Sequence, residues 1–141
     1  MGLVESVAVI AAVLVPAGPL GVPVIAPAAL GQDDGDILNV NADAAAGAIA
    51  ASLAARLLVF VTDVPGVRGK DGRVIGRLDA DRVRALVDDG TIEGGMLPKV
   101  EACLVAAAAG CRAAIVATRG MDSVERLLAG EQVGTVFEAA A

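Results

Sequence analysis

Hydrophobic residues along the chain form two kinds of run, separated by clusters of glycine, proline, asparagine and aspartate. The runs at 57–62 and 112–118 are almost continuously apolar, which is typical of strands buried on both faces of a helix-covered parallel sheet. The runs at 41–55, 79–90 and 96–107 repeat apolar residues at helical spacing. This spacing predicts three helices with the inward-facing residues Ala46, Ile49, Ala50 and Leu53; Val83, Leu86 and Val87; and Met96, Val100, Cys103, Leu104 and Ala107.

Shorter patterns complete the predicted fold. Short strands are expected at 21–27 and 135–137, and Asp122 is expected to cap a helix that ends near residue 129. Turn residues at 32–36 and 70–73 predict two hairpin tips, and those at 63–66 predict a turn. The alternation of strands and helices indicates an α/β fold, a layered α/β/α sandwich with a mainly parallel sheet. At 141 residues without an internal repeat, residues 1–141 are expected to form a single domain.

Composition narrows the classes of function. The chain is 56% hydrophobic and has two phenylalanines as its aromatic residues, so its core must consist of Val, Leu, Ile and Ala. A net charge of −6 without a Lys/Arg cluster argues against nucleic-acid binding. The lack of histidine excludes Ser-His and Cys-His catalytic pairs, and no metal site is expected. Cys103 and Cys111 are expected to be buried, reduced thiols of a cytoplasmic protein.

Residues 6–31 carry no charge, which raises the alternatives of a membrane span or a signal peptide. Four prolines interrupt this stretch, and Glu5 stands where a signal peptide has its positive charges. We therefore expect buried strands and turns here, with no membrane contact.

Three clusters of residues could carry chemistry, and each follows a predicted strand or precedes a predicted helix. At such positions open α/β sheets bind ligands, and helix N-termini bind anions. Each cluster also has a purely structural interpretation, as a helix cap, a turn or a solvent-exposed helix start. The clusters are Asn39-Val40-Asn41-Ala42-Asp43, Thr62-Asp63-Val64-Pro65-Gly66 and Gly94-Gly95-Met96-Leu97-Pro98-Lys99.

Lys99 is the least expected of these residues. It falls near the N-terminus of a predicted helix, where the helix dipole disfavours a cation by roughly 0.3–1 kcal/mol. Either its side chain points into solvent, where this cost is small, or it has a function that offsets the cost.

Together these motifs resemble the acetylglutamate kinases of the amino-acid kinase family. The resemblance runs from about residue 21 to residue 117 and is specific, because it combines Asn-Val-Asn-Ala-Asp with Gly-Gly-Met-x-Pro-Lys-Val-Glu-Ala in the family's order and spacing. It covers the family's C-terminal, nucleotide-binding half, whereas residues 1–20 are divergent.

The resemblance implies transfer of the γ-phosphoryl group of ATP, with Mg²⁺ carried by the nucleotide, to the side-chain carboxylate of N-acetyl-L-glutamate. Lys99 would stabilise the transferring group and Asp43 would orient catalytic lysines. Asn39 and Asn41 would bind the amino-acid substrate. The residues implied to lie along the nucleotide are Thr62, Asp63, Gly66, Gly94, Gly95 and Met96.

The sequence also departs from the family. The Lys-x-Gly-Gly segment and second glycine-rich loop of the family's N-terminal half do not occur in it. We therefore expect a partial kinase domain that works with a complementing N-terminal half or as a homo-oligomer. Two alternatives remain: a carrier-linked aminoadipate kinase of lysine biosynthesis, and a nucleotide-binding half-domain without turnover.

Overall fold

The computed structural model describes residues 22–31, 34–118 and 122–138. The chain divides into two compact units, Met1–Ala45 and Ala46–Ala141, and each is described by itself. Most of the prediction that residues 6–31 form buried strands falls on residues outside the described ranges. Among the residues described, no helix is long and apolar enough to cross a membrane.

The described part of the first unit is a β-hairpin followed by the start of a helix. Strand β1 (Ala28–Leu30) pairs antiparallel with β2 (Ile37–Asn39), so the predicted hairpin tip is confirmed. The predicted strand at 21–27 is wrong, because residues 22–27 form no strand and β1 begins only at Ala28. Pro23 and Pro27 lack the N–H group that a sheet requires, which explains why pairing starts after them.

Helix α1 (Ala42–Ser52) confirms the predicted helix but ends earlier. The side chain of Asn41 caps it, accepting hydrogen bonds from the backbone N–H groups of Asp43 (2.9 Å) and Ala44 (3.0 Å). Because the helix ends at Ser52, Leu53 leaves the inward face and is 72% exposed, so its prediction as a core residue is wrong. Ala54 follows in the left-handed region, at φ 47°.

The second unit is built on a four-stranded sheet with the order β3-β5-β6-β4. The strands are β3 (Leu57–Thr62), β4 (Arg77–Leu78), β5 (Arg112–Ala117) and β6 (Thr135–Phe137). Strand β3 pairs parallel with β5 and β4 pairs parallel with β6, whereas β5 and β6 are antiparallel. The sheet is therefore mainly parallel, as the sequence predicts.

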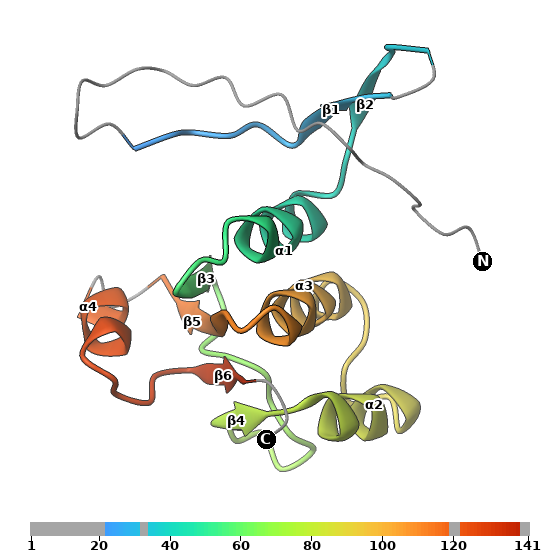
Figure 1. The fold of residues 1–141 in the computed structure, drawn as a ribbon. Helices are drawn as coiled ribbons and strands as arrows, with labels where there is room; N and C mark the ends of the chain where they lie inside the picture. The colour runs from blue at the N-terminus through green and yellow to red at the C-terminus, as the bar shows by residue number, and fades with distance from the viewer. Residues whose placement is uncertain (1–21, 32–33, 119–121, 139–141) are drawn as a thin grey trace. The chain divides into compact units, whose positions relative to one another are not determined.

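Helices cover both faces of this sheet, which confirms the layered α/β/α arrangement (Figure 1). Helices α2 (Ala80–Asp88) and α3 (Met96–Ala108), with the end of α1, pack on the face that carries Phe60, Ile115 and Phe137. The short helix α4 (Asp122–Leu128) packs on the other face through Leu127. The largest fully buried side chains are those of Phe137, Leu78, Ile115, Leu127, Val67, Val100, Val116 and Val136.

Strand β3 departs from its predicted environment. Its continuous apolar sequence predicts burial on both faces, but β3 is an edge strand in which only Phe60 is buried. Val61 is 54% exposed. The prediction of burial on both faces is therefore wrong, because five of the six residues of β3 are only partly buried or exposed. Within the described residues, nothing pairs with the outer edge of β3 either.

Several other local predictions are confirmed, whereas the prediction of Asp122 as a helix cap is wrong, because Asp122 is the first residue of α4. Residues 70–73 form a hairpin tip, closed by the isolated antiparallel bridge between Arg68 and Val74. Asp79 caps α2 by accepting a hydrogen bond from the backbone N–H of Arg82 (2.8 Å). Cys103 and Cys111 are buried, free thiols.

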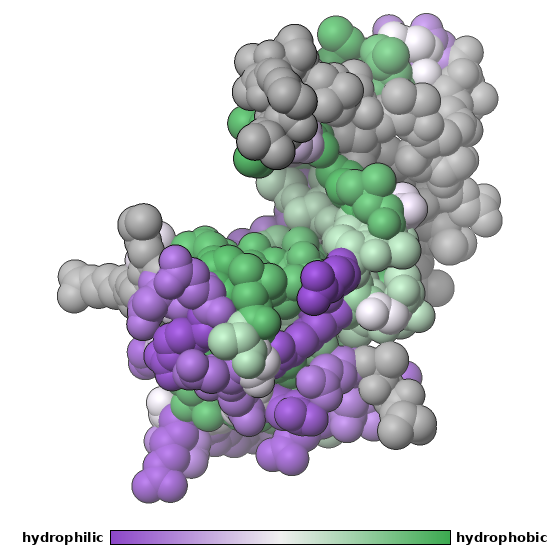
Figure 2. Space-filling view, turned by 60° about the vertical axis from the view of Figure 1, so that its left-hand side comes forward, coloured by the Kyte–Doolittle hydropathy of each residue, from purple (hydrophilic) through white to green (hydrophobic). Residues whose placement is uncertain are grey.

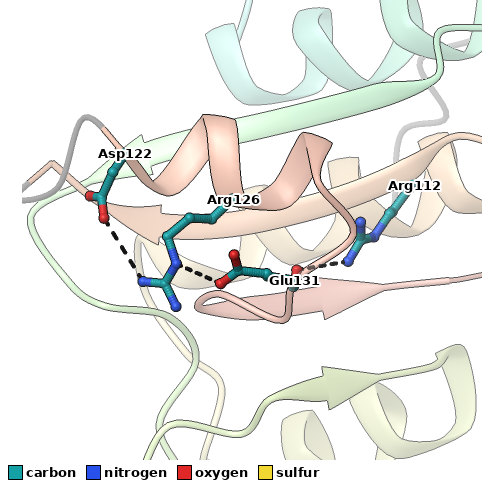
Figure 3. Close-up of polar contacts among 4 residues, drawn as sticks. All are labelled: Arg112, Asp122, Arg126 and Glu131. Atoms are coloured by element: carbon teal, nitrogen blue, oxygen red, sulfur yellow. Dashed lines mark hydrogen bonds and ion pairs between the residues drawn. The ribbon is translucent and has the colours of Figure 1, made fainter.

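A guanidinium group holds α4 in place against the sheet (Figure 3). Arg112, at the start of β5, donates hydrogen bonds to the carbonyl oxygens of Leu127 (2.9 Å), in the last turn of α4, and of Glu131 (3.1 Å), just after the helix. Arg126 in turn forms ion pairs with Glu131 (2.8 Å) and Asp122 (4.0 Å). A cation at a helix C-terminus is favourable because it faces the negative end of the helix dipole.

Candidate nucleotide-binding site

Two of the three predicted clusters lie at the same end of the sheet in the second unit. Parallel strands β3 and β5 both end there, so Thr62 and the turn after it stand at the carboxyl edge. Helix α3 leads directly into β5 and packs against it, so the helix runs antiparallel to the strand (Figure 1). The N-terminus of α3, with residues 94–99, therefore lies at this edge too.

The start of α3 is suited to an anion. No side chain caps it, and its first turn contains no acidic residue. Within the described residues, the exposed backbone N–H groups of Gly94 and Gly95 have no protein acceptor. An atom added at the Cβ position of either glycine would meet nothing within 4 Å, so a ligand can approach this backbone closely.

Lys99 occupies the first turn of α3 and is half-buried. The structure therefore does not support the interpretation that Lys99 simply extends into solvent. A partly buried cation beside an uncapped helix start raises the local positive potential where a phosphate would bind.

The turn after β3 is fixed by hydrogen bonds of Thr62 at its start and by the tight packing of Gly66 at its end. Thr62 donates its hydroxyl to the carboxylate of Asp63 (3.0 Å), and its carbonyl oxygen accepts from the backbone N–H and the hydroxyl of Thr118 (both 2.7 Å). Gly66 is buried at φ 147° with no room for a side chain, because its Cβ position lies 2.6 Å from the hydroxyl oxygen of Thr135. A rigid turn of this kind can present Asp63 at the sheet edge in one orientation.

The third cluster belongs to the first unit. Asn39 ends β2, where it pairs with Ala28, and Asn41 caps α1. Asp43 lies in the first turn of α1 and is half-buried. The structure therefore gives Asn41 a local structural role, and a substrate role for Asn39 and Asn41 remains a prediction.

A groove in the second unit was missed by the sequence reasoning. It has a volume of about 630 Å³ and lies between the hairpin at 69–73 and helix α2. Lys70 on the hairpin forms an ion pair with Asp89 after α2 (3.1 Å), and Asp89 also accepts from the hydroxyl and the N–H of Thr91. In the sequence, only the opposite charges of Lys70 and Asp89 point to this ion pair. Oppositely charged residues are so frequent in proteins that their presence does not predict a contact.

This arrangement predicts a pH dependence of stability. The Thr91 hydroxyl, followed by Lys70 and the Thr91 N–H, lowers the pKa of Asp89. A lowered folded-state pKa stabilises the protein above the unfolded-state pKa of about 4, and this stabilisation is lost as the pH falls through the folded-state value. Denaturant unfolding should show a loss of stability below about pH 4 that is smaller in Asp89→Asn. An unchanged pH profile in this variant, with Asp88→Asn as control, would contradict the role of Asp89.

Comparison with known proteins identifies the family to which this nucleotide-site candidate belongs. The model of the amino acid kinase family matches residues 12–117. The chain belongs to the amino acid kinase family. It is 53% identical over 95 residues to an acetylglutamate kinase of Sinorhizobium medicae and 50% identical over 95 residues to one of Gluconobacter oxydans. Each match covers 67% of this chain and 32% of the relative, so the chain spans about a third of the length of these curated relatives.

Solved structures of known proteins share this fold. A Streptococcus mutans protein of 30% sequence identity superposes with a TM-score of 0.68, over 82% of this chain and 42% of its own. Carbamate kinase from Giardia lamblia, solved with AMP-PNP, superposes with a TM-score of 0.63 over 77% of this chain and 36% of its own. At 24% identity the latter shows only that the amino acid kinase fold is shared.

Proposed function

We propose that this chain supplies the nucleotide-binding part of a cytoplasmic acetylglutamate kinase, which transfers the γ-phosphoryl group of ATP to the side-chain carboxylate of N-acetyl-L-glutamate. The observation that carries the proposal is that the turn after β3 and the uncapped start of α3 lie at the same end of the sheet. The similarity to acetylglutamate kinases favours this substrate over a carrier-linked aminoadipate.

The proposed phosphoryl transfer depends more on neutralising negative charge than on covalent catalysis by the protein. The acceptor carboxylate is ionised at neutral pH, so no general base is needed, and a chain without histidine can serve. Phosphoryl transfer depends on in-line positioning and on stabilising charge on the equatorial oxygens. In this proposal Lys99 and the N–H groups of Gly94 and Gly95 supply that charge stabilisation, and Met96 lies along the nucleotide.

The other assigned residues complete the division of roles. Thr62, Asp63 and Gly66 border the nucleotide. Asn39 and Asn41 bind the amino-acid substrate, and Asp43 orients the catalytic lysines. In this proposal Mg²⁺ is carried by the nucleotide.

Replacing Lys99 with alanine should weaken the binding of MgADP and of a magnesium-bound ATP analogue several-fold, because a charge-assisted contact to phosphate is lost. Thermal stability should change little, since no core residue is altered. Titration calorimetry of the purified chain measures the first effect and thermal melting measures the second.

Arg84→Ala is the matched control, because it removes one exposed positive charge from α2, where Arg84 pairs only weakly with Asp81 (3.5 Å). It should leave nucleotide affinity within experimental error of the unmodified chain. Equal affinities of the Lys99→Ala chain and the unmodified chain would contradict the role of Lys99. A folded chain that binds neither nucleotide would contradict the proposed function itself.

A half-domain that binds nucleotide without turnover is distinguished by a second assay. The chain is mixed with the N-terminal part of the S. medicae acetylglutamate kinase, and formation of ADP is followed with ATP and N-acetylglutamate. Turnover that needs both components supports the kinase. Saturable nucleotide binding without turnover in the mixture would reduce the proposal to a binding module.

A further inference from the structure

The carbonyl oxygen of Thr62, at the end of β3, accepts two hydrogen bonds from a single residue. The pairing of β3 with β5 ends at Thr62 and Ala117, and Thr118 comes next in the chain. The backbone N–H of Thr118 donates to the carbonyl oxygen of Thr62 (2.7 Å) and so continues the ladder. The hydroxyl of Thr118 donates to the same oxygen (2.7 Å), although strand pairing does not require this bond. Both lone pairs of the carbonyl oxygen are therefore used.

The two bonds fix the peptide group that leads into the turn. The peptide unit between Thr62 and Asp63 is planar, so its orientation as a whole is set once its oxygen is held from two directions. The direction in which the chain leaves β3 is thereby restricted. The Cα–Cβ bond of Asp63 follows that direction.

The side chain of Asp63 is held through the same threonine. The hydroxyl of Thr62 donates to the carboxylate of Asp63 (3.0 Å). Thr62 is half-buried, whereas Asp63 and Thr118 are exposed. A continuous chain of contacts therefore runs from Thr118 through Thr62 to the carboxylate that, in the proposed function, borders the nucleotide.

The start of the turn depends on these contacts more than its end does. Pro65 has a fixed φ, and Gly66 is buried against Thr135, so the far end of the turn is held by covalent geometry and packing. Figure 2 shows that hydrophilic side chains of this unit lie at its surface around a hydrophobic area, where water competes for their hydrogen bonds. Freedom gained on losing the Thr118 hydroxyl would therefore fall on Asp63 and Val64.

We propose that Thr118 is a positioning residue of the nucleotide site, which holds the peptide group between Thr62 and Asp63 so that the carboxylate meets the nucleotide in one orientation. The proposal rests on the proposed function, because it takes Asp63 to border the nucleotide. Thr118 acts through Thr62 and need not touch the nucleotide itself. A group that is already ordered loses less conformational entropy on binding, which raises affinity.

Thr118→Val tests this role because it keeps the β-branched shape and the backbone N–H and removes only the hydroxyl. It should weaken the binding of MgADP about threefold to tenfold, as measured by titration calorimetry. Thr118→Ser is the matched control, since it retains the hydroxyl, and it should bind MgADP like the unmodified chain. The three chains should melt at nearly the same temperature, because the residue is exposed.

A double-mutant cycle shows whether Thr118 acts through Asp63. Asp63→Ala removes the carboxylate that Thr118 is proposed to position. In that background Thr118→Val should have no further effect on MgADP affinity, because residues that act through one shared contact are not additive. An equal loss of affinity in both backgrounds would overturn the proposal, as would equal affinities of the Thr118→Val chain and the unmodified chain.

A measurement without nucleotide separates this role from the proposed function. NMR order parameters of the backbone amide groups of Asp63 and Val64 report their motion in the ligand-free chain. These order parameters should fall in Thr118→Val and be unchanged in Thr118→Ser. Unchanged values in Thr118→Val would overturn the role of Thr118 alone. A folded chain that binds no MgADP would overturn the proposed function, and the role of Thr118 with it.

Discussion

Replacing Gly134 with alanine should lower the free energy of unfolding by about 3–5 kcal/mol, or prevent folding. Gly134 has φ 65°, and a Cβ atom there would lie 2.1 Å from the carbonyl oxygen of Ile115, in the middle of the sheet. Neither backbone can move away easily, because residues 135–137 and 113–115 pair with each other directly beside this position. Urea unfolding monitored by circular dichroism measures the effect.

Gly130→Ala separates the cost of a left-handed backbone from the cost of the steric clash with Ile115. Gly130 has φ 87°, but its Cβ position has no atom within 4 Å. The variant should therefore show only the cost of a left-handed alanine, about 1–2 kcal/mol. Similar losses in both variants would show that backbone conformation alone matters and that the close approach to Ile115 does not.

The second large effect is expected from Thr135→Val, which should destabilise the chain by about 2–4 kcal/mol. Thr135 is fully buried, and its hydroxyl accepts from the N–H of Val67 (2.8 Å) and donates to the carbonyl of Ile75 (2.7 Å). Valine has nearly the same shape, so packing is kept while the buried N–H of Val67 and the partly buried carbonyl of Ile75 lose their partner. The turn after β3 should loosen as well, because Val67 follows Gly66 directly.

Two comparisons make the Thr135 result interpretable. Thr135→Ser keeps the hydroxyl and should retain most of the stability that the valine variant loses. Thr118→Val removes an exposed hydroxyl bond to the carbonyl of Thr62, where water can substitute, and should cost less than about 1 kcal/mol. If the Thr135→Val and Thr118→Val variants lose the same free energy of unfolding, the buried hydrogen bonds of Thr135 stabilise the chain no more than an exposed hydrogen bond does.

The sequence predicts local elements well where short-range physical chemistry determines them. Asp79 caps α2, the apolar run at 57–62 forms a strand with the predicted bounds, and the helix carrying Val100 and Cys103 buries the predicted face. These features depend on caps, periodicity and turn residues within one segment. The segment at 22–27 is apolar enough for a strand, but Pro23 and Pro27 lack the N–H groups that strand pairing requires.

Long-range features could not be predicted in the same way. The bridge from Thr135 to Val67 and Ile75 joins positions some 60 residues apart, and an isolated threonine carries no sign of it. The edge position of β3 could not be predicted either. A run of apolar residues indicates that a strand favours burial, but it does not show which strands lie beside it. For the candidate site, the sequence indicated the turn after β3 and the start of α3, whereas the groove beside the hairpin required the structure.

The order of the strands in the sheet has a consequence for how the chain folds. Strand β6 is the last described strand in the sequence, yet it lies between β5 and β4, and β4 has no other partner in the described sheet. Helix α3, β5 and β6 can assemble from contacts close in sequence, whereas β3 and β4 each pair across a long loop, residues 63–111 for β3 with β5 and residues 79–134 for β4 with β6. Closing loops of this length is slow compared with local assembly. The centre of the sheet, β5 with β6, is therefore expected to form before both of its outer strands, and β4 can join only after β6 is in place.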